Sequence, residues 1–461
     1  MVEFDPCRLT EWCGGTWHNA MPPVVRGVSI DSRAVRPGNI FVAIRGPNFD
    51  GHDFVSGAVK QGACAAIISR RDLLGQFACP LLLVEDTTAA LQRMAAAYRR
   101  SISTRTIAVT GSVGKTTVKE MIADVLSVRL ATARTIGNLN NEYGLPLSIL
   151  NMEPRSRAGV FELGVSHPGE MKPLCDVLMP DWAVVTFIGP VHLEFFGSEE
   201  KIACEKSVLL RSLPSDGLAF VGHDGPWHDF LRSSASCSSI SVGRHDNADY
   251  VWDGGKNGEN MVRVLEKKTG ERFEYKMPLP GEHMAYNSLF AVAVARAHGF
   301  DWSEIRGALE KFQARPMRWE SKTICGVCVI NDAYNANPIS MAAALRTFSG
   351  MPHQGRKWLV LAGMRELGAS SEKAHEELGA CVTQFAWAGL VTVGPLGKII
   401  ARGAAAGGMA ERNIFQCENH EEAAGVLVRK LKPGDAVLFK ASRGEKIEKA
   451  LEIWEKKCFI T

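Results

Sequence analysis

The stretch Thr110-Gly111-Ser112-Val113-Gly114-Lys115-Thr116-Thr117 decides the fold, because a glycine-containing run that ends in Gly-Lys-Thr is typical of loops holding nucleotide phosphates. The apolar run 107–109 before it predicts a buried strand, and residues 118–128 after it follow a helical period. A glycine turn between strand and helix could also occur without a ligand. The flanking elements favour the phosphate loop, which predicts an α/β sheet with ATP or GTP at its edge.

Each residue type in this loop has a chemical reason. Gly111 and Gly114 let the backbone turn so that its N–H groups point inward. Lys115 supplies a positive charge for the phosphates, and Thr116 offers a hydroxyl to Mg²⁺ at the start of a helix. Val109 stands where the common pattern has one more glycine. The expected phosphate contacts come from Gly111, Ser112, Val113, Gly114, Lys115, Thr116 and Thr117.

Length and composition indicate a soluble enzyme of several domains. A chain of 461 residues is too long for one ordinary core and predicts roughly two to four domains. The net charge of +3 comes from interleaved acids and bases, which argues against nucleic-acid or membrane-surface binding through bulk charge. The acidic start of the chain, and the lack of an apolar run near about 18 residues, predict a cytoplasmic protein. Twelve scattered cysteines predict reduced, mostly buried thiols.

Three segments differ in their pattern of expected strands, helices and turns, and together they predict an α/β protein of three domains. Residues 1–100 hold short strand-like runs broken by Gly and Pro, which predicts a small N-terminal α/β domain. In 101–314, strands interspersed with helices predict a central P-loop domain with a mostly parallel sheet. In 315–461, the same alternation predicts a C-terminal Rossmann-like α/β domain. The expected strands are 39–44, 106–109, 159–163, 182–188, 327–330, 358–361, 390–393 and 436–439, and the expected helices are 87–100, 118–128 and 198–212.

Candidate metal ligands follow the strands of the central segment, where open α/β sheets bind ligands. Glu162 lies near the end of the strand 159–163, and His192 follows the strand 182–188 after a Gly-Pro turn. With the hydroxyl of Thr116 they could hold one or two magnesium ions, although histidine is a less usual ligand for so hard a cation. Taken singly, Glu162 could pair with a surface cation and His192 could be a satisfied loop histidine. Their shared placement favours the metal site.

Lys206 lies on the apolar face of the expected helix 198–212, because apolar residues stand at i−4, i−3, i+3 and i+4 from it. A buried ammonium needs a partner or loses its charge. On these residues alone, the favoured interpretation is snorkelling, in which the stem packs and the amine reaches water. In the second interpretation, the neutral amine has reacted with CO₂ to give a carbamate that faces the metal site.

At these residues the chain resembles a known family, the Mur ligases of peptidoglycan synthesis. All members share the phosphate loop, whereas the run Tyr334-Asn335-Ala336-Asn337-Pro338 is far more specific and resembles the last-acting type of these ligases. The similarity spans the whole chain. The matching stretches are 31–33, 50–54, 111–117, 135–141 with Gly144 and Pro146, 162–164, 189–194, 203–206, 331–338 with Ser340 and Met341, and 440–443.

The resemblance implies an ATP-dependent peptide ligase. This type joins D-alanyl-D-alanine to UDP-N-acetylmuramoyl-tripeptide through an acyl phosphate, giving the UDP-MurNAc-pentapeptide precursor of peptidoglycan. It implies ATP and Mg²⁺ as cofactors, these two small molecules as substrates, and a monomer with no nucleic-acid partner and no membrane span. The alternatives that share the loop are a sister Mur ligase adding a different amino acid and a folylpolyglutamate-type ligase. A nucleotide-gated binding switch, by contrast, would hydrolyse ATP without forming an amide.

The resemblance also assigns roles to matching positions. Catalytic roles fall to Lys115, Glu162, His192 and Lys206, and metal binding falls to Thr116, Glu162, His192 and Lys206, with Lys206 carbamoylated. Beyond the loop, ATP contacts are expected from Asn287, Arg318, Asp332, Tyr334 and Asn335. On composition alone, Arg318 is a surface charge and Tyr334 and Asn335 are turn residues. Substrate contacts are expected from Ser32, Arg33, His52, Asn138 and Asn141.

Three positions depart from the pattern of the family. Gly363 stands where an acid is common, and Met317 stands where a glycine usually precedes the arginine that reaches ATP. Met284 stands where an asparagine often follows the histidine of the adenine site. These departures concern individual contacts and leave the expected metal and phosphate residues in place.

Overall fold

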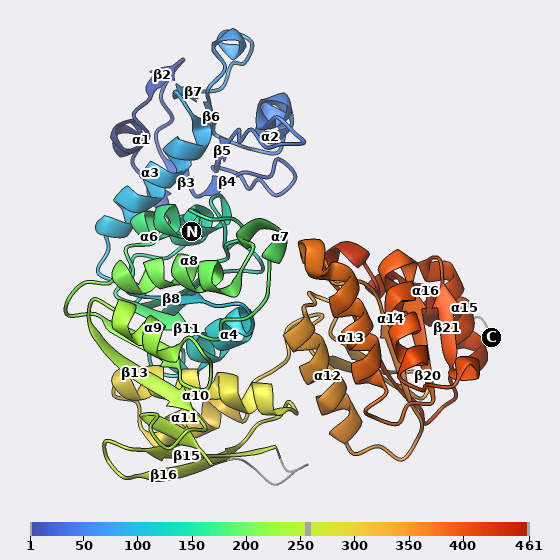
Figure 1. The fold of residues 1–461 in the computed structure, drawn as a ribbon. Helices are drawn as coiled ribbons and strands as arrows, with labels where there is room; N and C mark the ends of the chain where they lie inside the picture. The colour runs from blue at the N-terminus through green and yellow to red at the C-terminus, as the bar shows by residue number, and fades with distance from the viewer. Residues whose placement is uncertain (1, 254–259, 459–461) are drawn as a thin grey trace.

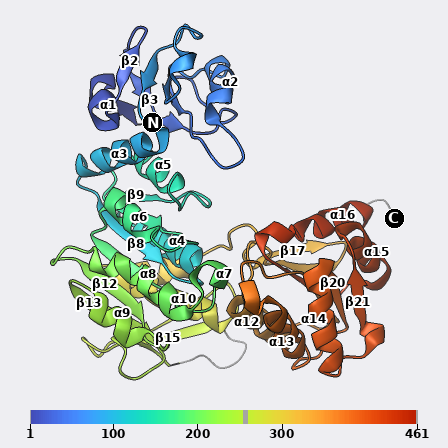
Figure 2. The ribbon, with the colours of Figure 1, turned by 45° about the horizontal axis from the view of Figure 1, so that its top comes forward.

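The computed structural model describes residues 2–253 and 260–458, which form three α/β domains with mostly parallel sheets (Figure 1). The predicted fold class is therefore confirmed. Figures 1 and 2 both show the N-terminal and C-terminal domains apart from each other, each next to the central domain. Within these residues, no helix combines the length and apolar character that a membrane crossing requires.

The N-terminal domain is built on a sheet with strand order β2-β7-β6-β5-β4, in which β4 to β7 run parallel. The helix expected at 87–100 is confirmed, and its first turn is capped by the carboxylate of Asp86, which accepts a hydrogen bond from the N–H of Ala89. The strand expected at 39–44 is shorter than predicted. The elements are β1 (Glu3–Phe4), α1 (Pro6–Cys13), β2 (Thr16–His18), β3 (Val25–Arg26), β4 (Val28–Ser29), β5 (Ile40–Val42), α2 (Val55–Lys60), β6 (Ala65–Ile68), β7 (Leu81–Leu83) and α3 (Thr87–Arg100).

Helix α3 fastens this domain to the central one. Its apolar face belongs to the same buried cluster as apolar residues of α5 (Gly144–Leu150) and α6 (Met171–Leu178). At its end, the hydroxyl of Tyr98 donates a hydrogen bond to the carbonyl of Met152 at 2.5 Å. A shared core makes the two domains one packed unit at this boundary rather than two tethered ones.

The central sheet has strand order β16-β15-β14-β13-β12-β11-β8-β10-β9, with β9 to β14 parallel and β15 and β16 antiparallel. Strand β8 lies inside this sheet and is covered on both faces. Ile107 and Val109 pack in one apolar cluster with α4 and α10, while Ala108 packs in the other with α5, α6 and α8. The elements are β8 (Arg105–Thr110), α4 (Lys115–Leu126), β9 (Thr132–Arg134), β10 (Ala158–Glu162), β11 (Trp182–Val185), α7 (Leu193–Phe196), α8 (Glu199–Arg211), β12 (Leu218–Gly222), α9 (His228–Ser234), β13 (Ser238–Gly243), β14 (Tyr250–Trp252), β15 (Met261–Glu266), β16 (Arg272–Lys276), α10 (Glu282–Ala297) and α11 (Trp302–Leu309).

The C-terminal sheet has strand order β17-β18-β22-β19-β20-β21 and is parallel except at β17. The four strands predicted in this segment are confirmed to within a residue at each end. Their buried runs carry helices on both faces, as in other open α/β sheets. The elements are β17 (Glu320–Ile324), β18 (Val327–Asn331), α12 (Pro338–Gly350), β19 (Lys357–Leu361), α13 (Ser371–Val382), β20 (Gly389–Val393), α14 (Gly394–Ala406), β21 (Ile414–Cys417), α15 (His420–Lys430), β22 (Ala436–Lys440) and α16 (Glu448–Cys458).

The cysteines correct one expectation. All of them lie within the described ranges as free thiols, but only Cys13, Cys175 and Cys417 among them are buried. The expectation of mostly buried thiols is therefore wrong. Cys325, for example, lies in the exposed turn between β17 and β18, where there is no core to cover it.

Candidate active site

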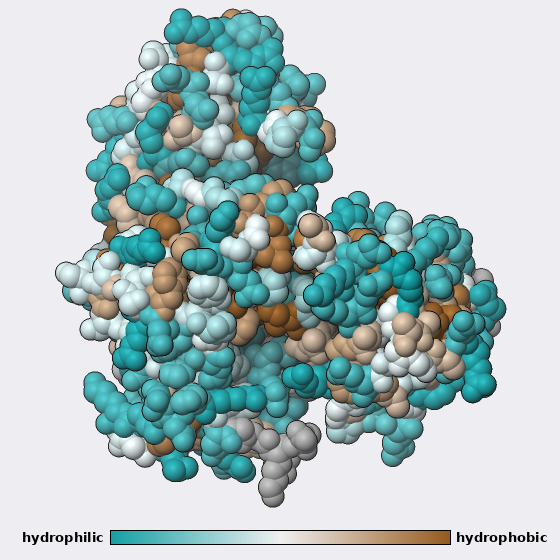
Figure 3. Space-filling view, viewed as in Figure 1, coloured by the Kyte–Doolittle hydropathy of each residue, from teal (hydrophilic) through white to brown (hydrophobic). Residues whose placement is uncertain are grey.

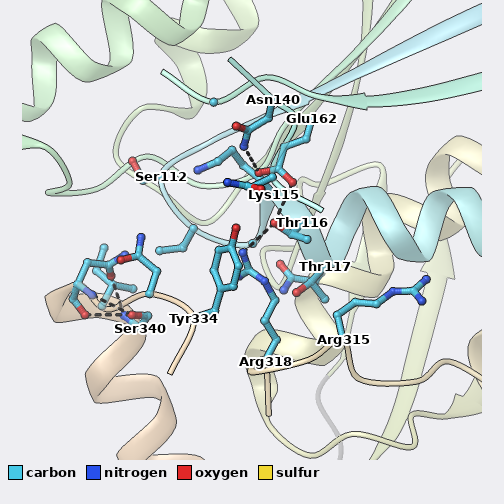
Figure 4. Close-up of a pocket in the computed structure, with 18 of the residues that line it drawn as sticks. Ser112, Lys115, Thr116, Thr117, Asn140, Glu162, Arg315, Arg318, Tyr334 and Ser340 are labelled. Carbon is cyan, nitrogen blue, oxygen red and sulfur yellow. Dashed lines mark hydrogen bonds between the residues drawn. The ribbon is translucent and has the colours of Figure 1, made fainter. Parts of the chain in front are cut away.

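A cleft of about 580 Å³ opens between the central and C-terminal domains, beyond the carboxyl ends of β8 and β10 (Figure 4). Both domains and the segment that joins them contribute to its walls. This is the edge at which open α/β sheets bind ligands. The sequence-predicted residues that line it are Ser112, Val113, Gly114, Lys115, Thr116, Thr117, Asn138, Asn141, Glu162, His192, Asn287, Arg318, Asp332, Tyr334 and Asn335.

The phosphate loop needs both of its glycines. Gly111 has φ 146° and Gly114 has φ 85°, backbone angles that side chains disfavour. A Cβ atom on Gly111 would lie 2.0 Å from Oγ1 of Thr186, and one on Gly114 would lie 2.6 Å from Oδ1 of Asn287. Gly114 is also the N-cap residue of α4, so the loop leads directly into a helix N-terminus suited to anions.

The neighbouring loop after β11 locks the phosphate loop in place. The hydroxyl of Ser112 donates to the carbonyl of Gly189 at 2.9 Å, and the hydroxyl of Thr186 donates to the carbonyl of Val113 at 2.6 Å. Strand β11 consequently ends at Val185, three residues before the predicted end, because the next residues bond to the phosphate loop. The expected extent of this strand is wrong for that reason.

Glu162 is the centre of a polar cluster, and its side chain is only 3% exposed (Figure 4). One carboxylate oxygen accepts a hydrogen bond from the hydroxyl of Thr116 at 2.8 Å, and the other accepts from the amide of Asn140 at 2.8 Å. Arg318, from the segment that leads into the C-terminal domain, donates to the same hydroxyl at 2.9 Å. Asn140 was not predicted as a site residue, although it lies in the matching run 135–141.

Two buried lysines of the central domain, Lys119 and Lys206, differ in their partners. Lys119 donates to the carbonyl of Thr135 at 2.8 Å and pairs with Glu120 at 2.7 Å. Lys206 on α8 is 1% exposed, and among the described residues none forms a hydrogen bond or ion pair with its amine. Burial lowers the pKa of Lys206 well below its usual range, and the positive charge of Lys115 adds to this effect. At 1% exposure almost the whole side chain, stem and amine alike, is withdrawn from water, which does not fit the snorkelling interpretation of Lys206.

Lys115 lies at the start of α4, where its amine donates to the carbonyl of Gly111 at 2.8 Å. Burial lowers the pKa of Lys115, while the carboxylate of Glu162 opposes that shift. The ammonium is thus held over the loop in which phosphates are expected.

The C-terminal domain adds a second set of cleft residues. The guanidinium of Arg318 lies 4.1 Å from the ring centre of Tyr334, a cation–π contact. Asp332 pairs with Lys440 at 2.6 Å, and Lys440 is a buried cleft residue that the sequence reasoning missed. Asn337 caps α12 through a hydrogen bond from the N–H of Ser340. The Tyr-Asn-Ala-Asn-Pro run therefore builds a helix start as well as a cleft wall.

His192 connects the two domains. It lines the cleft, and its Nδ1 is hydrogen-bonded to Oε2 of Glu366 in the C-terminal domain. This hydrogen bond lowers the pKa of the Glu366 carboxyl. Glu366 was not predicted as a site residue, although it lies in the run 362–368 that contains the departure at Gly363 and otherwise follows the pattern of the family.

Some predicted residues lie away from the cleft. His52 is buried with both ring nitrogens engaged, by the carboxylate of Asp50 at 2.5 Å and by the N–H of Ser69 at 2.9 Å. Arg33 is exposed and paired with its neighbour Asp31. The space-filling view shows a notch between the N-terminal and C-terminal domains (Figure 3). The predicted residues outside the cleft lining are Ser32, Arg33, His52, Gly111 and Lys206.

The donor set of the cleft fits a nucleotide-carried Mg²⁺. Glu162 and Thr116 present hard oxygen atoms, which Mg²⁺ prefers. Among residues 2–253 and 260–458, no group of three or more His, Cys, Asp or Glu side chains could hold a metal ion. A magnesium ion here would thus depend on phosphate and water ligands, as is usual for this cation beside a nucleotide.

Together the fold and the cleft define a three-domain P-loop protein whose main cleft is lined by residues of the central and C-terminal domains. Three family models match the chain in order. They are described as "Mur ligase family, catalytic domain" over residues 24–99, "Mur ligase middle domain" over 109–295, and "Mur ligase, glutamate ligase domain" over 317–443. The chain belongs to the Mur ligase family.

Similar proteins agree with this assignment over nearly the whole chain. The UDP-N-acetylmuramoyl-tripeptide–D-alanyl-D-alanine ligase of Bacillus subtilis is 35% identical over 455 residues, 98% of each chain. A MurF crystal structure from Acinetobacter baumannii has a TM-score of 0.89 at 29% identity, with 99% of both chains covered. A MurF ligase from Thermotoga maritima in complex with ADP has a TM-score of 0.80 at 30% identity, covering 95% of this chain and 98% of that one. Use of ATP is supported by this complex.

Proposed function

We propose that this chain is an ATP-dependent ligase that joins D-alanyl-D-alanine to UDP-N-acetylmuramoyl-tripeptide. The product is the UDP-MurNAc-pentapeptide precursor of peptidoglycan. The observation that carries the proposal is the single cleft in which the phosphate loop, the Glu162 carboxylate and the guanidinium of Arg318 face one another. The substrates are those in the shared name of the relatives, which favours this activity over a sister ligase or a folylpolyglutamate-type ligase.

The first chemical step activates the acceptor carboxylate. A carboxylate oxygen of the tripeptide attacks the γ-phosphorus of ATP, the bond from that phosphorus to ADP breaks, and an acyl phosphate forms. Lys115 binds the phosphate oxygens, and Arg318 offers a second positive charge from the other wall of the cleft. Neutralising charge as it moves is the main task in phosphoryl transfer.

The second step forms the amide. The amine of D-alanyl-D-alanine attacks the acyl carbon, the tetrahedral intermediate expels phosphate, and the nitrogen releases a proton. No protein nucleophile takes part. Because an acyl phosphate hydrolyses, water has to be excluded. Tyr334 and Arg318, which contact each other and line the cleft opposite the phosphate loop, are suited to that role.

Thr116, Glu162 and His192 hold Mg²⁺ in this proposal, and the ion supplies further neutralisation of phosphate charge when bound. Lys206 is proposed to be carbamoylated: its neutral amine adds to CO₂, a nitrogen–carbon bond forms and a proton leaves. The resulting negative group is favoured by the nearby charge of Lys115, which disfavours the ammonium form.

The remaining assignments complete the proposal. The domains comprise residues 1–100, 101–314 and 315–461, and the protein acts as a cytoplasmic monomer. The N-terminal domain binds the UDP-sugar and the C-terminal domain the dipeptide. The proposed substrate contacts are Ser32, Arg33, His52, Asn138 and Asn141, and the proposed ATP contacts beyond the phosphate loop are Asn287, Arg318, Asp332, Tyr334 and Asn335.

The test is to incubate the protein with ATP, Mg²⁺, D-alanyl-D-alanine and UDP-N-acetylmuramoyl-tripeptide containing lysine or diaminopimelate. We expect phosphate release that requires both substrates, and a product whose mass equals their sum less one water. Phosphate release without an amide product would instead identify a nucleotide-gated switch. A product with single amino acids in place of the dipeptide would identify a sister ligase.

A further inference from the structure

The His192–Glu366 pair crosses the boundary between two domains. His192 lies at the start of α7 in the central domain, and Glu366 lies in the loop after β19 in the C-terminal domain. Besides the side-chain hydrogen bond, the N–H of Glu194 donates to the carbonyl of Glu366 at 3.2 Å. Two hydrogen bonds of different kinds therefore join the same two loops.

Both ends of this contact have left-handed backbone conformations, with φ 52° at His192 and φ 63° at Glu366. Such angles are strained for a residue other than glycine, and they persist only where the surroundings impose them. Glycine at 368 lets the loops approach, since a Cβ there would lie 3.0 Å from Cα of Glu194. The contact is thus built into both loops and is not an incidental surface pair.

The loop that carries Glu366 is itself anchored inside the C-terminal domain. The N–H of Met364 donates to Nε2 of His375 at 2.9 Å, and the N–H of Arg365 donates to the hydroxyl of Ser442 at 3.0 Å. These bonds leave the loop little freedom relative to the rest of that domain. Glu366 therefore moves together with the C-terminal domain as one rigid unit.

The chemistry of the pair orients the histidine ring. A carboxylate only accepts hydrogen bonds, so Nδ1 of His192 is the nitrogen that donates here, and Nε2 is the nitrogen that the neutral ring can offer to a metal ion. Histidines that bind metals are usually oriented by such a carboxylate on the other ring nitrogen. We infer that Glu366 is a positioning residue that prepares His192 to bind the nucleotide-associated divalent cation only while the C-terminal domain is docked on α7.

This inference rests on the proposed metal role of His192 and adds a thermodynamic linkage between cation binding and docking of the C-terminal domain. Because the two groups belong to different domains, tighter docking strengthens cation binding, and cation binding strengthens docking to the same extent. Rotation of the C-terminal domain away from α7 removes the carboxylate from His192. Cation affinity is then lowered without any change in the phosphate loop.

The test measures cation binding rather than turnover. The affinity for a fluorescent ADP is followed in the whole protein as Mn²⁺ is titrated, for wild type, Glu366→Ala, Glu366→Gln and the control Glu377→Gln. Glu377 is on α13 of the same domain, 67% exposed and paired only with Lys373 among the described residues. We expect the half-saturating Mn²⁺ concentration to rise about 10-fold in Glu366→Ala and about 3-fold in Glu366→Gln, which keeps an acceptor oxygen. We expect no change in the control.

A double-mutant cycle separates positioning from mere structural support. If Glu366 acts through His192, Glu366→Ala has no further effect on the Mn²⁺ dependence in a His192→Ala background. An unchanged Mn²⁺ dependence in folded Glu366→Ala, or in Glu366→Gln if the alanine variant does not fold, overturns the inference. If wild type binds ADP without any dependence on Mn²⁺, the metal part of the proposed function falls as well. If ADP binding by wild type does depend on Mn²⁺ but the Glu366 variants show the same dependence, the inference falls and the proposed function stands.

Discussion

Replacing Lys206 by methionine should raise stability while abolishing ligation. The amine of Lys206 is buried near the charge of Lys115, and no described residue accepts a hydrogen bond from it; the carboxylates of Glu205 and Glu170 offset these effects only in part. Methionine keeps most of the apolar stem and removes the nitrogen. The activity is lost in this variant because the proposed carbamate cannot form.

The magnitude follows from proton linkage. In the unfolded chain, a lysine has a pKa of about 10.4, whereas burial lowers the pKa of Lys206 in the fold. At pH 8, the loss of this proton on folding therefore lowers stability by at most about 3 kcal/mol. This bound is about 1.36 kcal/mol for each pH unit between 8 and 10.4. Between the folded and unfolded pKa values the unfolded state binds more protons. Wild-type stability therefore rises with pH in that window and falls as the pH is lowered.

The assay compares the thermal midpoints of wild type and Lys206→Met between pH 7 and 9 in CO₂-free buffer. We expect the variant to be more stable by several degrees at pH 7, and the difference to shrink as the pH rises. Added bicarbonate should stabilise wild type alone, because only its amine can bind CO₂. A constant difference across this pH range, with no effect of bicarbonate, would refute the argument that Lys206 is a neutral amine in the fold.

Three further perturbations have defined outcomes. Gly111→Ala should lower the free energy of unfolding by about 2 to 4 kcal/mol and abolish ADP binding measured by calorimetry, because its Cβ would collide with Thr186. The control Gly57→Ala, which has open space around it in α2, should keep its stability and its ADP binding. Glu162→Ala should lower turnover at least about 100-fold and change ATP affinity far less; equal losses in both would point to simple nucleotide binding. Burial lowers the pKa of His298 to about 4, so stability should fall by up to about 3 kcal/mol as the pH drops from about 6.5 to 4. Denaturant titrations of His298→Gln should lack this component.

The fold was predictable because its strands are buried on both faces. Continuous apolar runs such as those of β8, β19 and β22 fit strands that are covered by helices on both faces, and their bounds were correct to within a residue or two. The error at β11 has a different origin. Its apolar run continues to Ile188, but the hydroxyl of Thr186 and the backbone beyond it bond to the phosphate loop. Tertiary contacts, which periodicity does not contain, ended this strand.

The site was predictable only where local sequence encodes chemistry. The phosphate loop and Glu162 follow strands whose ends share one edge, and that edge rule places them together. Asn140, Glu366 and Lys440 could not be found in this way, because each acts through a partner at least 22 positions away, in two cases more than 100. Lys206 stands between these cases, since helical periodicity predicts its burial. Only the structure shows that it lacks the partners that Lys119 has.

The three departures from the pattern of the family have physical explanations. A Cβ on Gly363 would lie 2.5 Å from Cδ1 of Leu396, so this leucine occupies the space that an acidic side chain at 363 would need. Met284 is buried within the apolar cluster that α10 forms against the central sheet. At Met317, φ is 59°, a conformation in which glycine would be free of strain.

Met317 has a consequence for the arginine beside it. Trp319, on the other side of Arg318, also has a left-handed φ of 57°, and its N–H is held by the carboxylate of Asp332 at 3.2 Å. The N–H of Met317 is held by Glu320 at 2.9 Å. Two strained residues thus flank Arg318, and each is fixed by a carboxylate. The chain keeps the backbone that directs this arginine at Thr116 without the usual glycine, so the conformation itself, and not the glycine, positions Arg318.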